Sequence, residues 1–213
     1  MAKSAGALEK VGRSAEERGG ENKGERTRAR IRSAFCELLA HKSFAAITIS
    51  DICRTADITV GGFYFHFPNQ DALLDEVIGE YGDDLGVALD AAMAVKGTDQ
   101  ARSICAALVC AYQDCNGLAR TFQQLRRTRS EYAARWRAIT DPRIVRLAAI
   151  LARERPDLSA PKAAFLAHAL ITMVVSQLDL TFVYDRSRTL TTATALTKNL
   201  TLLWRRMAEC PSP

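Results

Sequence analysis

The stretch Thr48–Pro68 constrains the fold more than any other part of the chain, because it holds start and stop signals for two short helices. Thr48 suits a helix N-cap, and Asp51, three residues on, completes the pattern of a capping box. Asp57 tolerates the left-handed backbone conformation, so we expect the first helix to turn there. Thr59 can cap a second helix that ends before the proline. Apolar residues mark the inner face of the first helix: Ile49, Ile52, Cys53 and Ala56.

The second helix, expected to reach about Phe65, is the candidate that reads duplex DNA. Gly61 and Gly62 each cost about 1 kcal/mol relative to Ala inside a helix. A close approach of the backbone to a base edge or a phosphate would offset that cost. Donors suited to phosphate oxygens accompany them: Thr59, Tyr64 and His66. A small helical hairpin, with an aromatic core and glycines for close packing, fits the same residues.

The full pattern I-x-D-I-x-x-x-A-x-I-T-x-G-x-F-Y-x-H-F-P-x-x-x-x-L resembles the signature of the TetR (tetracycline-repressor) family of bacterial transcription regulators. The resemblance runs from about Arg28 to Tyr81, and it implies that the second helix enters the major groove of an operator half-site. Asp57 replaces a usual Gly, and Gln70 replaces a Lys that usually contacts phosphate. The predicted DNA interface comprises Arg26, Arg28, Thr48, Thr59, Val60, Gly61, Gly62, Tyr64, Phe65, His66 and Gln70.

The charge distribution indicates how such a head would attract DNA. The chain carries a net charge of +5, but residues 33–80 hold two basic residues against seven acidic ones. Residues 1–32 hold nine Lys and Arg against five Glu. We therefore expect residues 1–25 to form a disordered basic arm and Arg26 and Arg28 to approach the phosphates. The alternative is a solvated helix start behind a disordered tail.

The remaining sequence predicts an all-α fold of about nine helices, because period-two alternation is absent and helical apolar stripes recur. We predict a three-helix head over residues 26–68, in which a first helix over about residues 27–41 comes before the helix–turn–helix. A long helix, Asn69–Val95, is expected to join the head to a helical effector-binding and dimerisation body over residues 69–210. Asp141-Pro142 predicts either a fresh helix or a kink in a longer one.

The last two helices are the predicted dimer interface. Pro161–Tyr184 is apolar on nearly all sides, as expected of a helix buried on more than one face. The TetR resemblance likewise implies that these helices pair across a two-fold axis, and a monomeric core is the alternative. The predicted interface residues are Leu170, Val174, Gln177, Leu196, Leu200, Leu203 and Trp204.

An effector pocket is expected between helices of the body. The candidate lining residues, each of which also suits a plain core, are Met93, Tyr112, Phe122, Trp136, Phe165, His168 and Met173. The segment Arg120–Arg137 is the densest basic run of the chain. Such a run is usually a solvated face, and the alternative is an entrance for an anionic effector such as a carboxylate or an acyl thioester.

Other classes of function find little support. The chain has three histidines and shows no pattern of a nucleophilic triad, a phosphate loop or a dinucleotide site, so neither an enzyme nor a cofactor is expected. Cys105, Cys110 and Cys115 fall on different helix faces and predict no metal site. No signal peptide is evident, and the apolar run Ala169–Val175 is too short to span a bilayer.

These observations predict a cytoplasmic, homodimeric transcriptional regulator. We expect it to be a repressor that binds double-stranded operator DNA and responds to an unknown small-molecule effector. The alternative is an adaptor or structural DNA-associated protein with the same fold and no effector.

Overall fold

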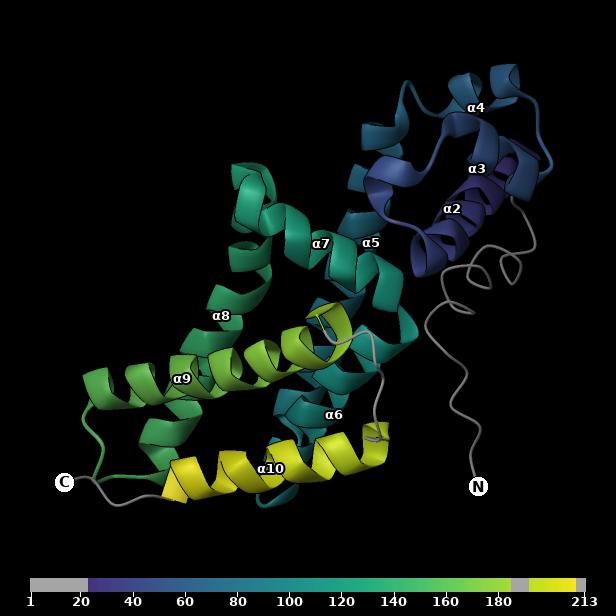
Figure 1. The fold of residues 1–213 in the computed structure, drawn as a ribbon. Coiled ribbons are helices and arrows are strands. Elements are labelled where there is room, and N and C mark those ends of the chain that lie inside the picture. The colour runs from purple at the N-terminus through teal and green to yellow at the C-terminus, as the bar shows by residue number, and fades with distance from the viewer. Residues whose placement is uncertain (1–22, 185–191, 210–213) are drawn as a thin grey trace. The chain divides into compact units, whose positions relative to one another are not determined.

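The computed structural model describes residues 23–184 and 192–209, and every secondary-structure element within them is a helix (Figure 1). This confirms the predicted all-α fold with about nine helices. Residues 1–22 of the expected arm lie outside the described residues. The elements are α2 Lys23–His41, η1 Phe44–Ala46, α3 Ile49–Ala56, α4 Val60–His66, α5 Gln70–Ala94, α6 Asp99–Asp114, α7 Asn116–Thr128, α8 Ser130–Glu154, α9 Ala160–Leu178, η2 Asp179–Tyr184 and α10 Ala193–Glu209.

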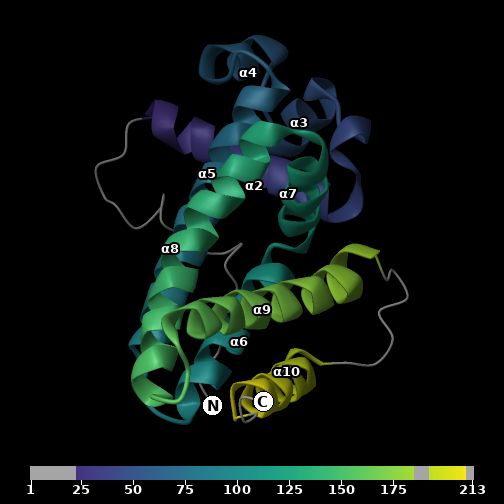
Figure 2. The ribbon, with the colours of Figure 1, turned by 90° about the vertical axis from the view of Figure 1, so that its left-hand side faces the viewer.

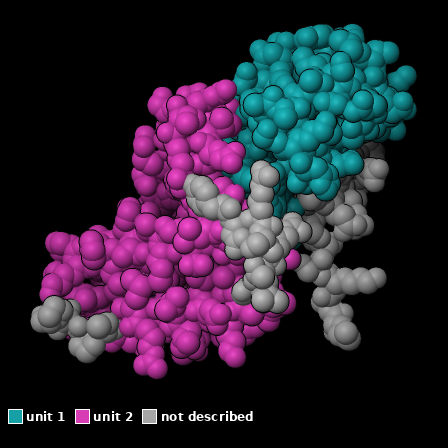
Figure 3. Space-filling model, in the orientation of Figure 1, with its two compact units in different colours: residues 1–81, 114–122 teal, residues 82–113, 123–213 magenta. Residues whose placement is uncertain are grey.

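The chain divides into two compact units, coloured separately in Figure 3. Unit 1 comprises residues 1–81 and 114–122, and unit 2 comprises residues 82–113 and 123–213. The divisions fall inside α5 and α7 and before the last residue of α6, so α5 and α7 contribute residues to both units. Unit 1 is therefore larger than the head expected over residues 26–68.

Unit 1 has one apolar core shared by five helices. Ile31 and Phe35 of α2, Ile52 of α3 and Phe63 of α4 are fully buried, and an apolar stripe of α5 closes the core. From α7, Phe122 is also fully buried and meets the ring of Tyr81 edge-on at a centroid distance of 6.3 Å. The remaining core residues of unit 1 include Leu39, Phe67, Leu73, Leu74, Val77 and Ile78.

Gly117 lets the start of α7 pack directly on the backbone at the end of α2. A Cβ at this glycine would lie 2.2 Å from the carbonyl oxygen of Leu39, a distance that no side chain can adopt. The guanidinium of Arg120, one turn later, donates to the same carbonyl at 2.9 Å. Gly117, the second residue of α7, thus permits a contact between segments nearly eighty residues apart.

Unit 2 is built around α8 and α9, which cross at a steep angle in both Figure 1 and Figure 2. Pro142 lies inside α8, so of the two alternatives at Asp141-Pro142 the structure has one continuous helix. Helix α10 lies beside α9. The core residues of unit 2 include Leu108, Tyr112, Tyr132, Leu147, Ala163, Ala167, Leu170, Val174, Leu178, Leu196, Leu200 and Trp204.

The continuous helical stretch Ala160–Val183, which combines α9 with the π-helix η2, is longer than the apolar run considered in the sequence. The stretch has 24 residues, and a window of 18 of them has a mean hydropathy of 1.6, so it is long and apolar enough to cross a membrane. The core helix of a soluble protein passes the same test, and residues along one face of α9 are buried in unit 2. We therefore interpret this stretch as a core helix.

Candidate DNA interface and ligand cleft

Helix α3 begins with the predicted capping box. The hydroxyl of Thr48 accepts from the backbone N–H of Asp51 at 3.1 Å, and the carboxylate of Asp51 accepts from the backbone N–H of Thr48 at 3.2 Å. These bonds, reinforced by the Thr48 hydroxyl and by Lys42, outweigh partial burial and lower the pKa of Asp51 to about 2. The carboxylate is ionised at neutral pH and fixes the direction in which α3 starts.

The turn between α3 and α4 is formed by Asp57, which adopts the left-handed conformation with φ 52° and ψ 57°. Thr59 then caps α4, because its hydroxyl accepts from the backbone N–H of Gly62 at 3.0 Å. Each helix of the pair is thus capped by its own threonine, as the sequence predicts. The caps fix where α4 begins and therefore which of its residues face outward.

The outward face of α4 is apolar and exposed. The exposed fractions of Val60, Tyr64 and Phe65 are 47%, 53% and 84%, whereas Phe63 is fully buried beneath them. A Cβ at Gly61 would meet nothing closer than the Thr59 hydroxyl at 4.0 Å, so this face has room for a close approach. Helix α4 contains no Lys or Arg, so its side-chain donors are the Tyr64 hydroxyl and the His66 imidazole.

Arg28, one of the predicted phosphate contacts, is instead held within unit 1. Its guanidinium forms an ion pair with Glu76 of α5, donates to the backbone carbonyl of His66 at 2.9 Å, and lies over the ring of Phe67 at 4.3 Å. Arg32 also bonds to Glu76 at 2.9 Å. Burial raises the pKa of Glu76, but the two arginines outweigh that effect and hold the pKa below its usual value.

The other predicted DNA contacts divide into exposed and internally bonded residues. Arg26 is exposed, and Thr48 and Thr59 are exposed but engaged as caps. Gln70 donates to the carbonyl of Phe44 at 3.3 Å. Burial, followed by the charge of Arg28, lowers the pKa of His66, so this imidazole is neutral at pH 7.

A cleft of about 810 Å³ opens within unit 2 between α7, α8 and α9. Trp136 and His168, two of the seven predicted pocket residues, line it. The other lining residues are Arg126, Arg127, Ala133, Arg137, Thr140, Asp141, Ile144, Val145, Ile171, Thr172, Val175 and Ser176. The cleft therefore combines an apolar floor with three arginines from the basic run noted in the sequence.

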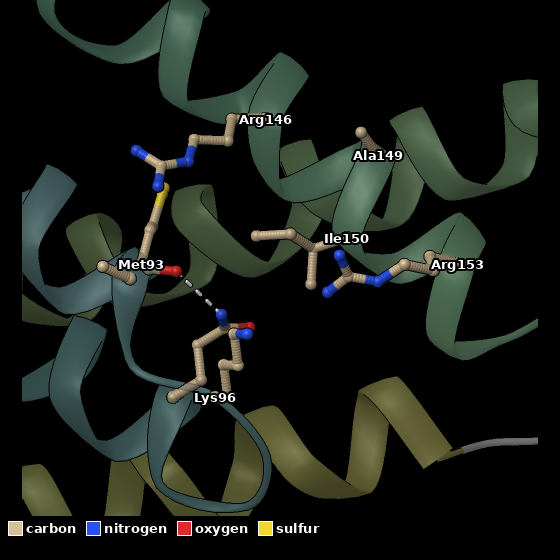
Figure 4. Close-up of a pocket in the computed structure, with 8 residues that line it drawn as sticks. Met93, Lys96, Arg146, Ala149, Ile150 and Arg153 are labelled. Carbon is tan, nitrogen blue, oxygen red and sulfur yellow. Dashed lines mark hydrogen bonds between the residues drawn. The ribbon is translucent and has the colours of Figure 1, made fainter.

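The remaining predicted pocket residues lie elsewhere. Phe122 belongs to the core of unit 1, Tyr112 is fully buried, and Phe165 is 77% exposed. Met173 is half-buried and does not line the cleft. Met93 lines a smaller groove of about 450 Å³, drawn in Figure 4, together with Lys96, Gln100, Arg146, Ile150 and Arg153.

A buried polar network behind the cleft was missed by sequence reasoning. The carboxylate of Asp179, at the junction of α9 and η2, accepts from the Tyr112 hydroxyl at 2.9 Å and from Arg126 at 3.2 Å. Arg127 approaches the same carboxylate at 3.7 Å. The only signal was an acidic residue in an otherwise apolar helix. The polar stripe His168, Thr172 and Ser176, spaced by four residues, would have indicated the cleft face of α9.

Some of the predicted dimer residues are buried within the protomer and others are exposed. Leu170, Val174, Leu196, Leu200 and Trp204 are buried within the protomer, whereas Gln177 and Leu203 are exposed. A buried side chain has no surface to offer a partner. The apolar residues that α9, η2 and α10 leave exposed are Phe165, Leu180, Leu202 and Leu203.

The cysteines of the described residues show no sign of a metal or redox site. Burial raises the pKa of Cys36 to about 12 and that of Cys105 to about 11, so both thiols stay protonated. No group of three metal-ligating side chains occurs in the part of the chain that the structure describes. The buried cysteines are small apolar core residues.

Comparison with known proteins identifies relatives of the head and of the whole fold. Residues 31–77 match the family described as "Bacterial regulatory proteins, tetR family". A segment of 54 residues, 25% of the chain, is 44% identical to the uncharacterized HTH-type transcriptional regulator YxbF of Bacillus subtilis. That match spans only 14% of the Bacillus protein.

The fold extends the likeness to most of the chain. A TetR-family regulator from Rhodococcus RHA1 has a TM-score of 0.70 at 22% identity, over 90% of this chain and 100% of that one. PfmR from Thermus thermophilus, a TetR-family regulator, has a TM-score of 0.67 at 17% identity, over 86% and 100%. GusR of Salmonella enterica has a TM-score of 0.65 at 19% identity, over 89% and 98%. Residues 31–77 therefore carry the likeness to tetR-family regulatory proteins, and most of the chain shares the fold of such regulators.

Proposed function

Because the chain belongs to the TetR family of bacterial transcriptional regulators, we propose that it is a homodimeric repressor released from its operator by a small molecule. Two copies would present two α4 helices to successive major grooves of a palindromic operator. A repressor of this kind acts on the chromosome, so we place it in the cytoplasm.

The observation that carries this proposal is the outward face of α4. Three large side chains stay exposed on a capped helix, although burial of each would stabilise a free-standing protein. An exposed apolar face without cations suits contact with the floor of the major groove, where thymine methyl groups are available. Exposed cations outside α4, such as Arg26, would supply the attraction to phosphates.

Release would require that effector and operator prefer different conformations of the same protein. The cleft in unit 2 offers space for an effector, and α5 supplies residues to both units as one continuous helix. A ligand that changes the tilt of α5 would change the separation of the two reading helices. An adaptor without an effector would not need a cleft of this size.

Selection of binding sites from a random duplex library tests the proposal directly. The full-length protein should enrich an inverted repeat whose half-sites lie about one or two helical turns apart. Enrichment of a single, non-repeated site would contradict the homodimeric reader. No enrichment over random sequence would contradict specific DNA binding altogether.

Tyr64 and Gly62 provide the first mutational prediction. Tyr64→Phe removes an exposed hydroxyl and should weaken operator binding by about 1–2 kcal/mol, the scale of a hydrogen bond to a charged phosphate. Gly62→Arg should abolish or redirect binding, because a side chain there meets the Thr59 hydroxyl at 3.3 Å and projects toward the DNA. Fluorescence anisotropy with the selected operator measures both. Unchanged affinity in the two variants would remove α4 from the interface.

A further inference from the structure

The cleft between α7, α8 and α9 carries a charge pattern that specifies its ligand more closely than the proposed function does. We propose that it binds a small amphipathic carboxylate, with the carboxylate at the arginines and an alkyl or aryl body along the apolar floor. This inference rests on the proposed function only in naming that ligand as the effector.

Positive charge dominates the lining. Arg126 and Arg127 of α7 and Arg137 of α8 line the cleft together with Asp141, and the carboxylate of Asp179 lies behind Arg126 and Arg127. The imidazole of His168 also lines the cleft and bonds to Thr172 through Nδ1 at 3.3 Å. Three guanidiniums against two carboxylates leave a net positive charge, which favours a bound anion.

Arg126 is held in place rather than left to move in solvent. Arg126 lies over the ring of Trp136 at 4.8 Å, and its Nη2 bonds to the buried carboxylate of Asp179. A guanidinium that is already fixed loses little side-chain entropy when it binds an anion.

The protein's own Asp179 identifies the kind of anion. This carboxylate lies within 3.2 Å of Arg126 and 3.7 Å of Arg127, so the two guanidiniums are already spaced to share a carboxylate. A ligand carboxylate on the cleft side would share the same pair. Asp141 on the rim disfavours a head group with two negative charges, which argues for a carboxylate over a phosphate monoester.

The rest of the lining describes the body of the ligand. Ile144, Ile171 and Val175 form an apolar surface beside Trp136, with the hydroxyls of Thr140 and Ser176 near it. A cleft of about 810 Å³ has the size of a site for a small organic molecule rather than for a single ion. An inorganic anion would leave this apolar surface in water.

Direct binding tests the proposal with four probes: decanoate, 4-phenylbutanoate, decanamide and monodecyl phosphate. In a Trp204→Phe background Trp136 is the one remaining tryptophan, so its fluorescence reports on the cleft, and calorimetry gives the affinity. At least one carboxylate should bind at least tenfold more tightly than decanamide and monodecyl phosphate. The better of the two carboxylates distinguishes an alkyl from an aryl body.

Charge-removing variants locate the anion. Arg126→Gln should abolish the preference for carboxylate over amide. Arg137→Gln, which changes an exposed arginine, should reduce carboxylate affinity at least fivefold without affecting folding. Arg153→Gln, on the same helix but in the smaller groove, is the matched control and should leave affinity unchanged. Circular dichroism verifies that each variant is folded.

Several outcomes would overturn the proposal: equal binding of decanoate and decanamide, tighter binding of the phosphate, binding of no probe, or loss of binding in Arg153→Gln alone. The operator assay separates this proposal from the proposed function. A carboxylate that binds the cleft without weakening operator binding contradicts release by an effector but leaves the ligand class intact. Specific operator binding without affinity for any probe contradicts only the ligand class.

Discussion

Asp57 adopts a backbone conformation that is unfavourable for a residue with a side chain. It is the one non-glycine residue with positive φ in the described part of the chain, at a position where the left-handed conformation favours glycine. Its exposed side chain makes no bond to another described residue, and Arg30 contacts only its backbone carbonyl, at 3.3 Å. A substitution at Asp57 should therefore change the backbone strain at this turn without removing a side-chain contact of the head.

Replacement of Asp57 by Gly should stabilise the protein by about 0.5–1 kcal/mol, since Gly adopts this conformation without a Cβ clash. Asp57→Asn should be close to neutral and Asp57→Ala should destabilise by a similar amount, since Ala tolerates positive φ poorly. Urea unfolding monitored by circular dichroism measures all three. The order Gly, Asn, Ala is the test, and an Ala variant as stable as the Gly variant would contradict it.

Asp51 makes the stability of the head depend on pH. Its pKa is about 2 in the folded protein, below the ordinary value of about 4 that it regains on unfolding. Its ionised form therefore stabilises the fold above about pH 4, and this contribution is lost as the pH falls from about 4 through about 2.

The pH experiment compares the wild-type protein with Asp51→Asn. The wild-type protein should have the higher urea midpoint at pH 6, and the difference between the two midpoints should shrink at about pH 2.5, between the folded and unfolded pKa values. Thr48→Val, which removes the hydroxyl of the capping box, should weaken the pH dependence as well. If the difference between the two urea midpoints is the same at low pH as at pH 6, the stabilisation does not come from the charge of Asp51.

At the scale of elements, the arginines of α2 divide into two kinds. Arg28 and Arg32 hold α2 against α5 through Glu76, so they act as positioning residues for the head. Arg26 is exposed at the start of the helix. From the sequence alone, these arginines look like a single basic cluster near the DNA, because the sequence does not show which of them forms an ion pair within the protein.

We expect Arg28→Ala to lower the free energy of unfolding by about 1–2 kcal/mol, because Glu76 loses the two charged hydrogen bonds that Arg28 donates. Arg26→Ala should leave stability unchanged. It should instead reduce the log–log salt dependence of DNA binding by about 0.9 for each phosphate that is no longer neutralised. Urea unfolding and anisotropy titrations at several salt concentrations measure the two effects. A lower salt slope in Arg28→Ala with unchanged stability would reverse the assignment.

Local sequence predicts the parts of the head that local contacts build. Thr48, Thr59 and Asn69 each bond to a backbone N–H three residues away, and such spacing is visible in the sequence. Contacts between distant segments leave no such pattern. Arg28 meets Glu76 across 48 residues, and Tyr112 meets Asp179 across 67, so the ion pair and the cleft network became visible only in the structure.

At the scale of the whole molecule, the proposed dimer requires a surface that the protomer leaves exposed. On the outer face of α9 and η2, Met173, Gln177 and Leu180 follow one another at spacings of four and three residues. On α10, Leu202 and Leu203 are exposed. We therefore propose these residues, rather than the buried Leu170 and Leu200, as the dimer contact.

Leu203→Glu and Leu180→Glu should each convert the dimer to monomers, because association would bury an unpaired charge at a cost of several kcal/mol. Their helical content should be unchanged, and operator affinity should fall with the loss of the dimer. Val87→Glu, at an equally exposed apolar position of α5, is the control and should remain dimeric. Light scattering that finds intact dimers for both test variants would move the interface to another face.

Unit 1 is built from two segments that are separated in the sequence, and this affects the order in which the chain can fold during synthesis. In the segment 114–122, Phe122 is part of the core of unit 1 and Gly117 packs against the backbone of α2. The ribosome nevertheless makes this segment after residues 82–113 of unit 2. The head therefore cannot complete its core as soon as its helix–turn–helix leaves the ribosome, although N-terminal domains commonly do so. A gene fragment that stops after Tyr81 would encode the DNA-reading helices without the last piece of their own interior.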